Sequence, residues 1–376
     1  MKRPLVALVA AAALLLGTCS SPGSSPAPSR APASPGPAST DAGDGATTVT
    51  DALGRRVAFE HAPRRIVLAG KGLFMVADAV YLFPEASSRV VALGQTAQNG
   101  RDFISVIDPD YAAKTILEGG AGVEEIAAAR PDVVLLKTSN ADSLGRPLEA
   151  LGVQVVYVEF ETPEQYLRDL GVLGQLFGDE ARAQQLVTFF RDRTDRVTTA
   201  LAGLGDAERP TVLLLYYTDK NGTVAFNVPP LGYIQSTEAR LAGGRLAWEG
   251  VQPGPGWTTV TLEQINAWNP DQIYVISYLG NVKDVVSRLT GDPLWQALRA
   301  VRQGRIYGFP GDFYSWDQPD PRWVLGLTWL AGKVHPERFG DLDLNREIRS
   351  FYRELYGLDD AAYQADIAPL LTGDLP

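Results

Sequence analysis

The apolar residues of one long segment recur with the period of an α-helix. Between residues 179 and 204 they are spaced by three, four and seven positions, and no Pro or Gly interrupts them before Gly203. Such spacing places them in one stripe along a helix. Asp179 is a suitable N-terminal cap and Gly203 a suitable C-terminal stop. The stripe consists of Ala183, Leu186, Phe190, Val197, Leu201 and Leu204. The pattern predicts a single long helix with one narrow apolar face.

The segments on the two sides of this helix repeat one another. Aligned on Pro131 and Pro270, both have the pattern Glu-x-Ile-x-Ala-x-x-Pro-Asp followed by aliphatic residues. This order predicts a short helix, a turn that ends it, and a buried strand. A strand-like run precedes each copy, at residues 64–70 and 210–217. The repeat therefore predicts an α/β protein of two Rossmann-like lobes, each with a central, mostly parallel sheet, joined by the long rigid helix.

The chain starts with the pattern of an export signal. Two basic residues precede an apolar run that is too short to cross a bilayer comfortably. The run ends in Leu-Gly-Thr-Cys, which resembles the lipidation box of bacterial lipoproteins, with Cys19 as the acylated residue. This pattern predicts a lipoprotein signal peptide over residues 1–19. Thr18 departs from the Gly, Ala or Ser usual at that place, so secretion with cleavage elsewhere is the alternative.

Composition extends this interpretation to the next segment. Cys19 is the only cysteine, which fits an acylation site better than a disulfide or a redox centre. Ser, Pro, Ala and Gly dominate residues 20–46, a disordered tether with too few large apolar side chains to fold. We therefore expect an extracytoplasmic protein held at a membrane by an N-terminal lipid. The folded part divides into an N-terminal lobe at 47–178, the linker helix at 179–204, and a C-terminal lobe at 205–376.

Charge and chemistry exclude several functions. The net charge of −10 argues against nucleic acid as a partner and against a polybasic membrane surface. The two histidines, His61 and His335, lie in unrelated positions, which opposes a bare zinc or manganese ion as the cargo. No Gly-x-Ser-x-Gly elbow and no His beside paired carboxylates is found, so we expect neither an enzyme nor a cofactor. We predict no metal site built from protein ligands.

The order of these motifs resembles one protein family. The hairpin-like residues 50–57, the segment 63–67 and the two Pro-Asp repeats are similar to the substrate-binding proteins of ABC importers for iron–siderophore complexes, haem and cobalamin. The resemblance covers residues 49–356 and implies the class III periplasmic-binding-protein architecture. It also implies that a monomer captures a metal chelate between its lobes and delivers it to an ABC permease dimer with its cytoplasmic ATPase.

The resemblance further implies two docking residues. In this family a Glu on each lobe pairs with Arg residues of the permease, and the matching positions here are Glu124 and Glu263. Charge-assisted Glu–Arg pairs suit this role because they set orientation and speed encounter. The alternative is that both are ordinary first-turn carboxylates that the helix dipole favours.

Residues at the carboxyl ends of predicted strands are candidate ligand contacts, because open α/β sheets bind ligands there. Lysines follow two strands of the N-terminal lobe, and aromatic residues are frequent in the C-terminal lobe. Rigid aromatic faces suit a large planar or greasy chelate, and Trp257 matches a place where cobalamin-binding relatives carry a ligand-contacting Trp. Tyr216 and Tyr217 must point to opposite faces of one strand. The predicted ligand-binding residues are Lys71, Lys137, Tyr217, Asn227, Trp257, Tyr278, Phe313, Tyr314 and Trp316.

The sequence leaves the cargo open. We expect a ferric siderophore, since it is the commonest cargo of the family that the chain resembles. Haem and cobalamin also suit an aromatic site, although no His offers an axial ligand. Free ferric iron held by Tyr, Asp and Glu oxygens is a rival, and so is another small imported ligand. A lipid-anchored sensory receptor without transport is the other functional class.

Overall fold

The computed structural model describes residues 45–251, 254 and 256–375. The predicted signal peptide, Cys19 and the tether as far as residue 44 lie outside the described residues. The described residues form one compact unit. No helix among them is both long enough and apolar enough to cross a bilayer.

The N-terminal lobe is built on a parallel sheet of five strands in the order β5-β4-β3-β6-β7. An antiparallel hairpin, β1–β2, precedes it. The four strands other than the edge strand β5 carry mostly buried aliphatic residues, as expected for a parallel sheet covered on both faces. The strands are β1 (Thr47–Thr50), β2 (Arg56–Phe59), β3 (Ile66–Leu68), β4 (Val90–Leu93), β5 (Thr115–Ile116), β6 (Val133–Lys137) and β7 (Val155–Val158). The helices are α1 (Leu73–Val80), α2 (Ala86–Arg89), α3 (Ile104–Ile107), α4 (Val123–Ala128), α5 (Arg146–Ala150) and α6 (Pro163–Phe177).

The C-terminal lobe has a mixed sheet in the order β11-β9-β8-β12-β13, with β10 also beside β8. Strands β8, β10, β12 and β13 are parallel, whereas β9 runs antiparallel to β8 and β11. The strands are β8 (Thr211–Lys220), β9 (Thr223–Val228), β10 (Arg245–Leu246), β11 (Thr258–Val260), β12 (Gln272–Ile276) and β13 (Ile306–Gly308). The helices are α8 (Ile234–Leu241), α9 (Leu262–Trp268), α10 (Val282–Gly291), α11 (Arg299–Arg302), α12 (Trp323–Val334), α13 (Leu344–Tyr356) and α14 (Asp360–Ala362).

The aspartates of the two Pro-Asp repeats make equivalent hydrogen bonds in the two lobes. The Asp132 carboxylate accepts the backbone N–H groups of Arg64 and Arg65 at 2.8 and 2.9 Å. The Asp271 carboxylate accepts the backbone N–H of Thr211 at 2.8 Å. Each aspartate therefore joins the start of the strand that follows it to the start of the first strand of the main sheet of its lobe, β6 to β3 and β12 to β8. The repeated Pro-Asp motif reflects this shared contact, which supplies an acceptor to backbone N–H groups at the amino ends of the strands.

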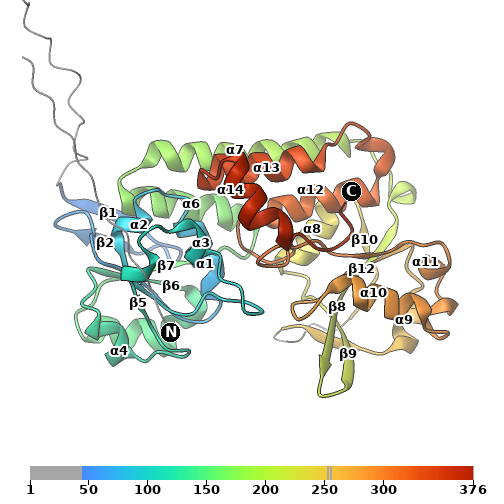
Figure 1. Ribbon diagram of the computed structural model, residues 1–376, viewed down its shortest axis with the longest axis horizontal. Coiled ribbons are helices and arrows are strands. Elements are labelled where there is room, and N and C mark those ends of the chain that lie inside the picture. The colour runs from blue at the N-terminus through green and yellow to red at the C-terminus, as the bar shows by residue number, and fades with distance from the viewer. Residues whose placement is uncertain (1–44, 252–253, 255, 376) are drawn as a thin grey trace, which may run out of the picture. The chain divides into compact units, whose positions relative to one another are not determined.

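Helix α7 (Glu180–Ala200) connects the lobes, as Figure 1 shows. The Asp179 carboxylate caps it by accepting the backbone N–H of Arg182 at 2.9 Å. The helix ends four residues before the predicted end, because the chain turns through Gly203 at a φ of 79°. The predicted apolar stripe is buried, with Leu204 partly buried and Phe189 added to it.

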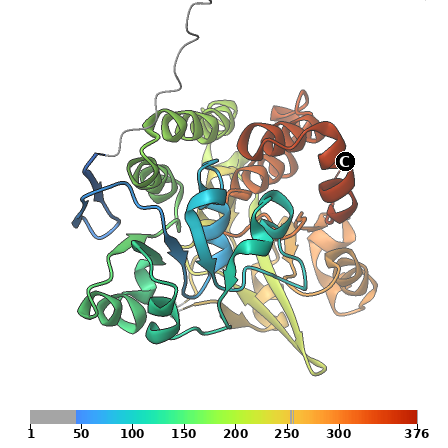
Figure 2. The ribbon, with the colours of Figure 1, turned by 60° about the vertical axis from the view of Figure 1, so that its left-hand side comes forward.

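The C-terminal helices α12 and α13 lie beside α7 in both views (Figures 1 and 2). The Trp323 ring of α12 stacks on Phe190 of α7 at 5.7 Å between centroids. From the start of α7, Arg182 donates a hydrogen bond of 2.8 Å to the Leu355 carbonyl of α13. In the same helix, the Tyr356 hydroxyl donates to the Asp78 carbonyl of α1 at 3.1 Å. Helix α13 thus contacts the N-terminal lobe as well, which a division of the chain at residue 205 does not capture.

Candidate ligand-binding site

A pocket of about 540 Å³ lies at the carboxyl edge of the N-terminal sheet. The chain leaves β3 toward β4 on one side and later returns to β6 on the other side, and open sheets place ligands at such a switch point. The pocket is lined by residues 69–74, 94–97 and 117–121, with Asn140, Ser143 and Leu144. We call it the N-terminal pocket.

The N-terminal pocket is rich in hydrogen-bond donors. Lys71 is exposed at its rim. Helix α1 begins there without a side-chain cap. The Met75 N–H of its first turn donates to the Gly72 carbonyl at 3.2 Å, which leaves the N–H groups of Leu73 and Phe74 as the candidate donors to an acceptor. Gly70 has a φ of +94°, and a Cβ there would come within 2.9 Å of the Asn140 side chain. Glycine is therefore needed for the tight turn that brings Lys71 beside Asn140, whose Oδ1 accepts the Lys71 backbone N–H at 3.2 Å.

Three aromatic rings gather at the carboxyl ends of the central strands of the C-terminal lobe. Tyr216 lies in β8, Tyr278 follows β12, and Trp257 directly precedes β11. The ring centroids are 4.5 Å apart for Tyr216 and Tyr278, and 5.1 Å apart for Tyr216 and Trp257. All three side chains are partly buried, and the neighbouring Leu279 is 65% exposed. We call these three rings the aromatic wall.

The aromatic wall borders the space between the lobes. A small cavity of about 50 Å³ is lined by Tyr278 from the C-terminal lobe and by Gln98, Asn99 and Arg101 from the N-terminal lobe. The loop that carries Gln98 continues directly from the residues that line the N-terminal pocket. The two lobes therefore present a donor-rich pocket and an apolar ring surface near one interface.

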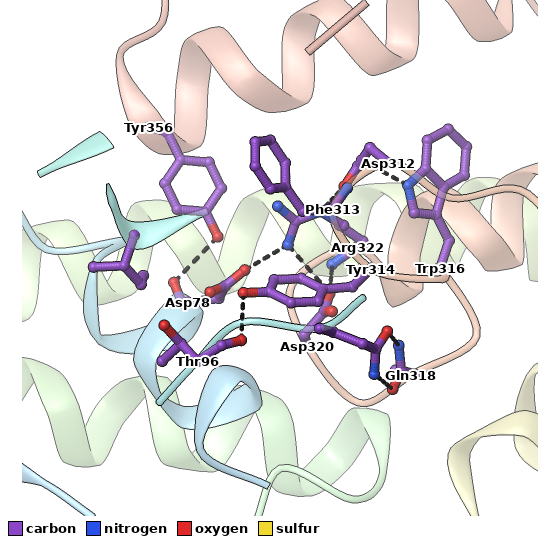
Figure 3. Close-up of polar contacts among 12 residues, drawn as sticks. Asp78, Thr96, Asp312, Phe313, Tyr314, Trp316, Gln318, Asp320, Arg322 and Tyr356 are labelled. Atoms are coloured by element: carbon purple, nitrogen blue, oxygen red, sulfur yellow. Dashed lines mark hydrogen bonds and ion pairs between the residues drawn. The ribbon is translucent and has the colours of Figure 1, made fainter. Parts of the chain in front are cut away.

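A buried ion cluster joins the lobes beside this space (Figure 3). Arg322 is fully buried, and its Nη1 donates to Asp78 of α1 at 2.5 Å while its Nε donates to Asp312 at 2.6 Å. Asp320 lies 3.7 Å from the same guanidinium. Burial raises the pKa of Asp78 to about 7, although the Arg322 charge opposes this rise. One cation among three buried carboxyl groups is expected to leave at least one of them protonated near neutral pH.

Aromatic contacts surround this cluster. The Phe103 ring of the N-terminal lobe lies 4.3 Å from the Arg322 guanidinium carbon. Tyr314 stacks on Phe74 of α1 at 4.6 Å, and its hydroxyl donates to the Thr96 carbonyl at 3.0 Å. Figure 3 shows Tyr314 between Thr96 and Arg322. The loop that follows β13 therefore packs as part of the interface between the lobes.

The comparison with known families decides the class of this protein. Residues 80–313 match the family described as periplasmic binding protein. The chain belongs to this family. The prediction of a substrate-binding protein with the class III periplasmic-binding-protein architecture is thereby confirmed.

Three relatives illustrate the family. The molybdate-binding protein MolA of Haemophilus influenzae is 24% identical over 337 residues, which cover 82% of this chain and 90% of MolA. The iron-uptake system-binding protein of Bacillus subtilis is 22% identical over 49% of this chain and 57% of its own length. A solved periplasmic solute-binding protein from Veillonella parvula has a TM-score of 0.67 at 21% identity, covering 86% of this chain and 97% of that structure. The protein is thus an extracytoplasmic solute-binding protein by family.

Three of the predicted ligand-binding residues lie where this periplasmic binding protein has open surface. Lys71 lies at the N-terminal pocket, and Trp257 and Tyr278 belong to the aromatic wall. Tyr216, which lies on the opposite face of its strand from Tyr217, is the ring nearest to both of the others. Gln98, which the sequence did not single out, has no chemical pattern that marks it in advance.

Three other predicted contacts are engaged within the protein instead of open to a ligand, which corrects those predictions. Lys137 is buried in an ion pair with Glu161. Tyr217 faces the other side of β8, where its hydroxyl accepts from Arg288 at 2.6 Å. The Asn227 amide is occupied within the sheet, since its Nδ2 donates to the Tyr216 carbonyl at 3.3 Å and its Oδ1 accepts a further hydrogen bond.

The aromatic loop after β13 needs a similar correction. Trp316 is fully buried, and its Nε1 donates to Asp312 at 2.8 Å. Phe313 packs against Phe103 of the other lobe at 5.2 Å. Phe313 and Tyr314 border the small cavity between the lobes, but both are buried. These rings join the lobes instead of presenting open faces to a ligand.

The two predicted docking residues have equivalent positions. Glu124 and Glu263 are exposed in the first turns of α4 and α9. Figure 1 shows α4 and α9 on the side of each lobe that faces away from α7. The backbone N–H of Glu263 and the Thr261 hydroxyl lower the pKa of the Glu263 carboxyl, which keeps it ionised at neutral pH.

Proposed function

We propose that this protein captures a metal chelate, with a ferric siderophore as its cargo, and delivers it to an ABC permease dimer with its cytoplasmic ATPase. The observation that carries the proposal is the pairing of the aromatic wall on one lobe with the lysine-bearing N-terminal pocket on the other. Aromatic rings supply contact area at low entropic cost, and Lys71 supplies charge for an acidic chelate. Glu124 and Glu263 are the proposed contacts to Arg residues of the permease.

The chemistry around the wall favours an intact chelate over a free ferric ion. No group of three or more His, Cys, Asp or Glu residues suited to a metal occurs within the part of the chain that the structure describes. The Tyr278 hydroxyl donates to Asp317 at 2.6 Å, and burial raises the pKa of this phenol well above its usual value. A phenol engaged in this way is a poor ligand for ferric iron, which supports a metal that arrives with its coordination already filled.

An oxyanion is the second candidate cargo. The observation in its favour is the uncapped start of α1 beside Lys71, which is a suitable place for a tetrahedral anion. The likeness to the molybdate-binding protein MolA points the same way. An anion of that size would occupy the N-terminal pocket and leave the aromatic wall unused.

Tryptophan quenching separates these candidates. We expect one ferric siderophore to quench the purified protein saturably, at concentrations where haemin, cyanocobalamin, molybdate and free Fe(III) do not. Trp257→Ala is expected to remove most of the quenching and to weaken binding at least about tenfold, because it removes a ring of the wall. Trp268→Phe, in α9 and outside the wall, is the matched control. Binding of molybdate alone, unaffected by Trp257→Ala, would replace the chelate with the oxyanion.

We propose in addition that Cys19 carries a lipid that anchors the protein at the outer face of a membrane. Cys19→Ser is expected to release the protein from the membrane fraction of expressing cells, because the tether then has no acyl chain to bury. Ser20→Ala, which keeps the thiol, should leave the distribution unchanged. Retention of Cys19→Ser in the membrane fraction would instead favour an uncleaved signal.

A further inference from the structure

We infer that Asp317 is a positioning residue for the aromatic wall, and that the wall takes an aryl or other flat conjugated group of the chelate. The inference rests on the proposed function, whose ligand it describes more closely. Asp317 itself does not touch the ligand. It holds Tyr278, whose ring face does.

The contacts of Asp317 leave its carboxylate little freedom. Asp317 is fully buried in the loop between β13 and α12. Its Oδ2 accepts the Tyr278 hydroxyl at 2.6 Å and the Gln235 amide at 3.2 Å. Its Oδ1 accepts the Ser315 hydroxyl at 2.5 Å. Three donors therefore meet on this carboxylate: Tyr278 from the loop after β12, Gln235 from α8, and Ser315 from the loop that carries Asp317.

This carboxylate sets the angle of the Tyr278 ring. A hydroxyl bound to a buried, hydrogen-bonded carboxylate is a strong charge-assisted contact. The Tyr278 ring then packs against Tyr216 at an interplanar angle of 40°, and Tyr216 meets Trp257 at 60°. A ring that is held by a hydrogen bond and packed against two further rings loses little rotamer freedom when a ligand binds. The wall is accordingly a preorganised surface.

The same contact decides which part of a ligand the wall can recognise. Because the Tyr278 hydroxyl is committed to Asp317, it is not free to coordinate a metal or to donate to ligand oxygens. The part of this side chain left for a ligand is therefore ring carbon, on a residue that is partly buried and lies next to the exposed side chain of Leu279. The carbon face of an aromatic ring stacks well on flat conjugated groups. A chelate with aryl groups uses this surface, whereas a chelate built only from aliphatic hydroxamates does not.

Other charged groups near Asp317 do not alter this assignment. Glu238 of α8 is also fully buried, and burial raises its pKa well above the usual value, with Asp317 and Asp320 adding to the rise. Neither carboxyl oxygen of Glu238 has a hydrogen-bond partner, so Glu238 does not compete with Asp317 for the Tyr278 hydroxyl.

Two probes and two variants test the inference in the full chain. The probes are a ferric tris-catecholate siderophore and a ferric trihydroxamate that has no aryl group. We expect Asp317→Asn and Tyr278→Phe each to weaken catecholate binding about tenfold, since each removes the charge-assisted contact that fixes the ring. The double variant should lose no more than either single one, because the two residues act through one contact. Hydroxamate binding should change little, and Asp219→Asn, an exposed carboxylate near the other face of β8, should change neither.

A readout without ligand keeps the positioning role testable. The coupled rings of the wall contribute to near-UV circular dichroism, and we expect Asp317→Asn and Tyr278→Phe to alter this signal similarly while the far-UV spectrum stays unchanged. An unaltered near-UV signal would overturn the positioning role. Equal weakening of both chelates in Asp317→Asn would overturn the preference for aryl groups. If the wild-type protein binds neither chelate, the proposed cargo and the ligand class fail together, and the circular dichroism alone decides the role of Asp317.

Discussion

Arg322→Met is expected to lower the free energy of unfolding at pH 8 by about 3–5 kcal/mol, because it leaves buried carboxyl groups without their cation. Arg322 is fully buried and contacts Asp78 from one lobe and Asp312 from the other. The variant loses an ion cluster and a contact between the lobes at once. Urea unfolding followed by tryptophan fluorescence measures the effect.

The pH dependence of this deficit identifies its cause. Without Arg322, the folded-state pKa of Asp78 should rise beyond its present value of about 7, whereas its unfolded pKa stays near about 4. A folded pKa above the unfolded one stabilises the folded state at low pH, and this advantage is lost as the pH rises through the folded pKa. The deficit of Arg322→Met should therefore be small at pH 5.5 and large at pH 8.

Arg288→Met is the matched control for this measurement. The Arg288 side chain is 58% exposed and lies 3.6 Å from Asp219, so its removal should cost no more than about 1 kcal/mol. If Arg322→Met lowered the free energy of unfolding by no more than Arg288→Met, or by the same amount at pH 5.5 and pH 8, the buried ion cluster would not be what holds the two lobes together.

Reversing both proposed docking charges, Glu124→Arg with Glu263→Arg, is expected to reduce import at least about tenfold while cargo affinity stays unchanged. The two exposed carboxylates lie in equivalent first turns of α4 and α9. Arginines at positions 124 and 263 would face the arginines that we propose on the permease, and like charges across an interface repel one another strongly. Uptake of radiolabelled ferric siderophore in cells that carry the transporter, compared with tryptophan quenching in vitro, separates docking from capture.

Glu180→Arg is the control, because Glu180 is also an exposed first-turn carboxylate but belongs to α7. It suffers the same loss of interaction with the helix dipole, yet it should leave import unchanged. An equal loss of import in Glu180→Arg, or normal import in the double reversal, would return Glu124 and Glu263 to the role of simple helix-terminus charges.

Local chemistry explains why much of the fold could be read from the sequence. Helix α6 has both of its bounds set locally, because Thr162 caps its start with its side chain and Gly178 ends it at a φ of 72°. The Pro-Asp repeats mark both lobes, because their aspartates make the same contacts to neighbouring strands. Signals of this kind depend on residues close in sequence or on one repeated contact, and they need no knowledge of the remaining packing.

The candidate site could be predicted only in part. The sequence directed attention to the ends of β8 and β12, since strand ends in such sheets face ligands, and the rings of the proposed wall gather there. It selected Tyr217 although Tyr216 lies in the wall, because a one-residue change of register exchanges the two faces of a strand. It also treated the aromatic loop at residues 309–317 as ligand contacts, although the Trp316 ring is fully buried.

The sequence by itself determined that this protein has two α/β lobes, a connecting helix and equivalent exposed glutamates, because periodicity, caps and repeated motifs act locally. Only the tertiary structure decided which aromatic rings stay open, because burial depends on what the other lobe places against them. Phe313 and Tyr314 are covered by Phe103 and Phe74 from more than 200 positions away in the chain. The link between Asp317 and Tyr278 likewise exists only once β13 lies beside β12. The aromatic composition was visible in advance, and the fold alone assigned each ring to the wall or to the interface between the lobes.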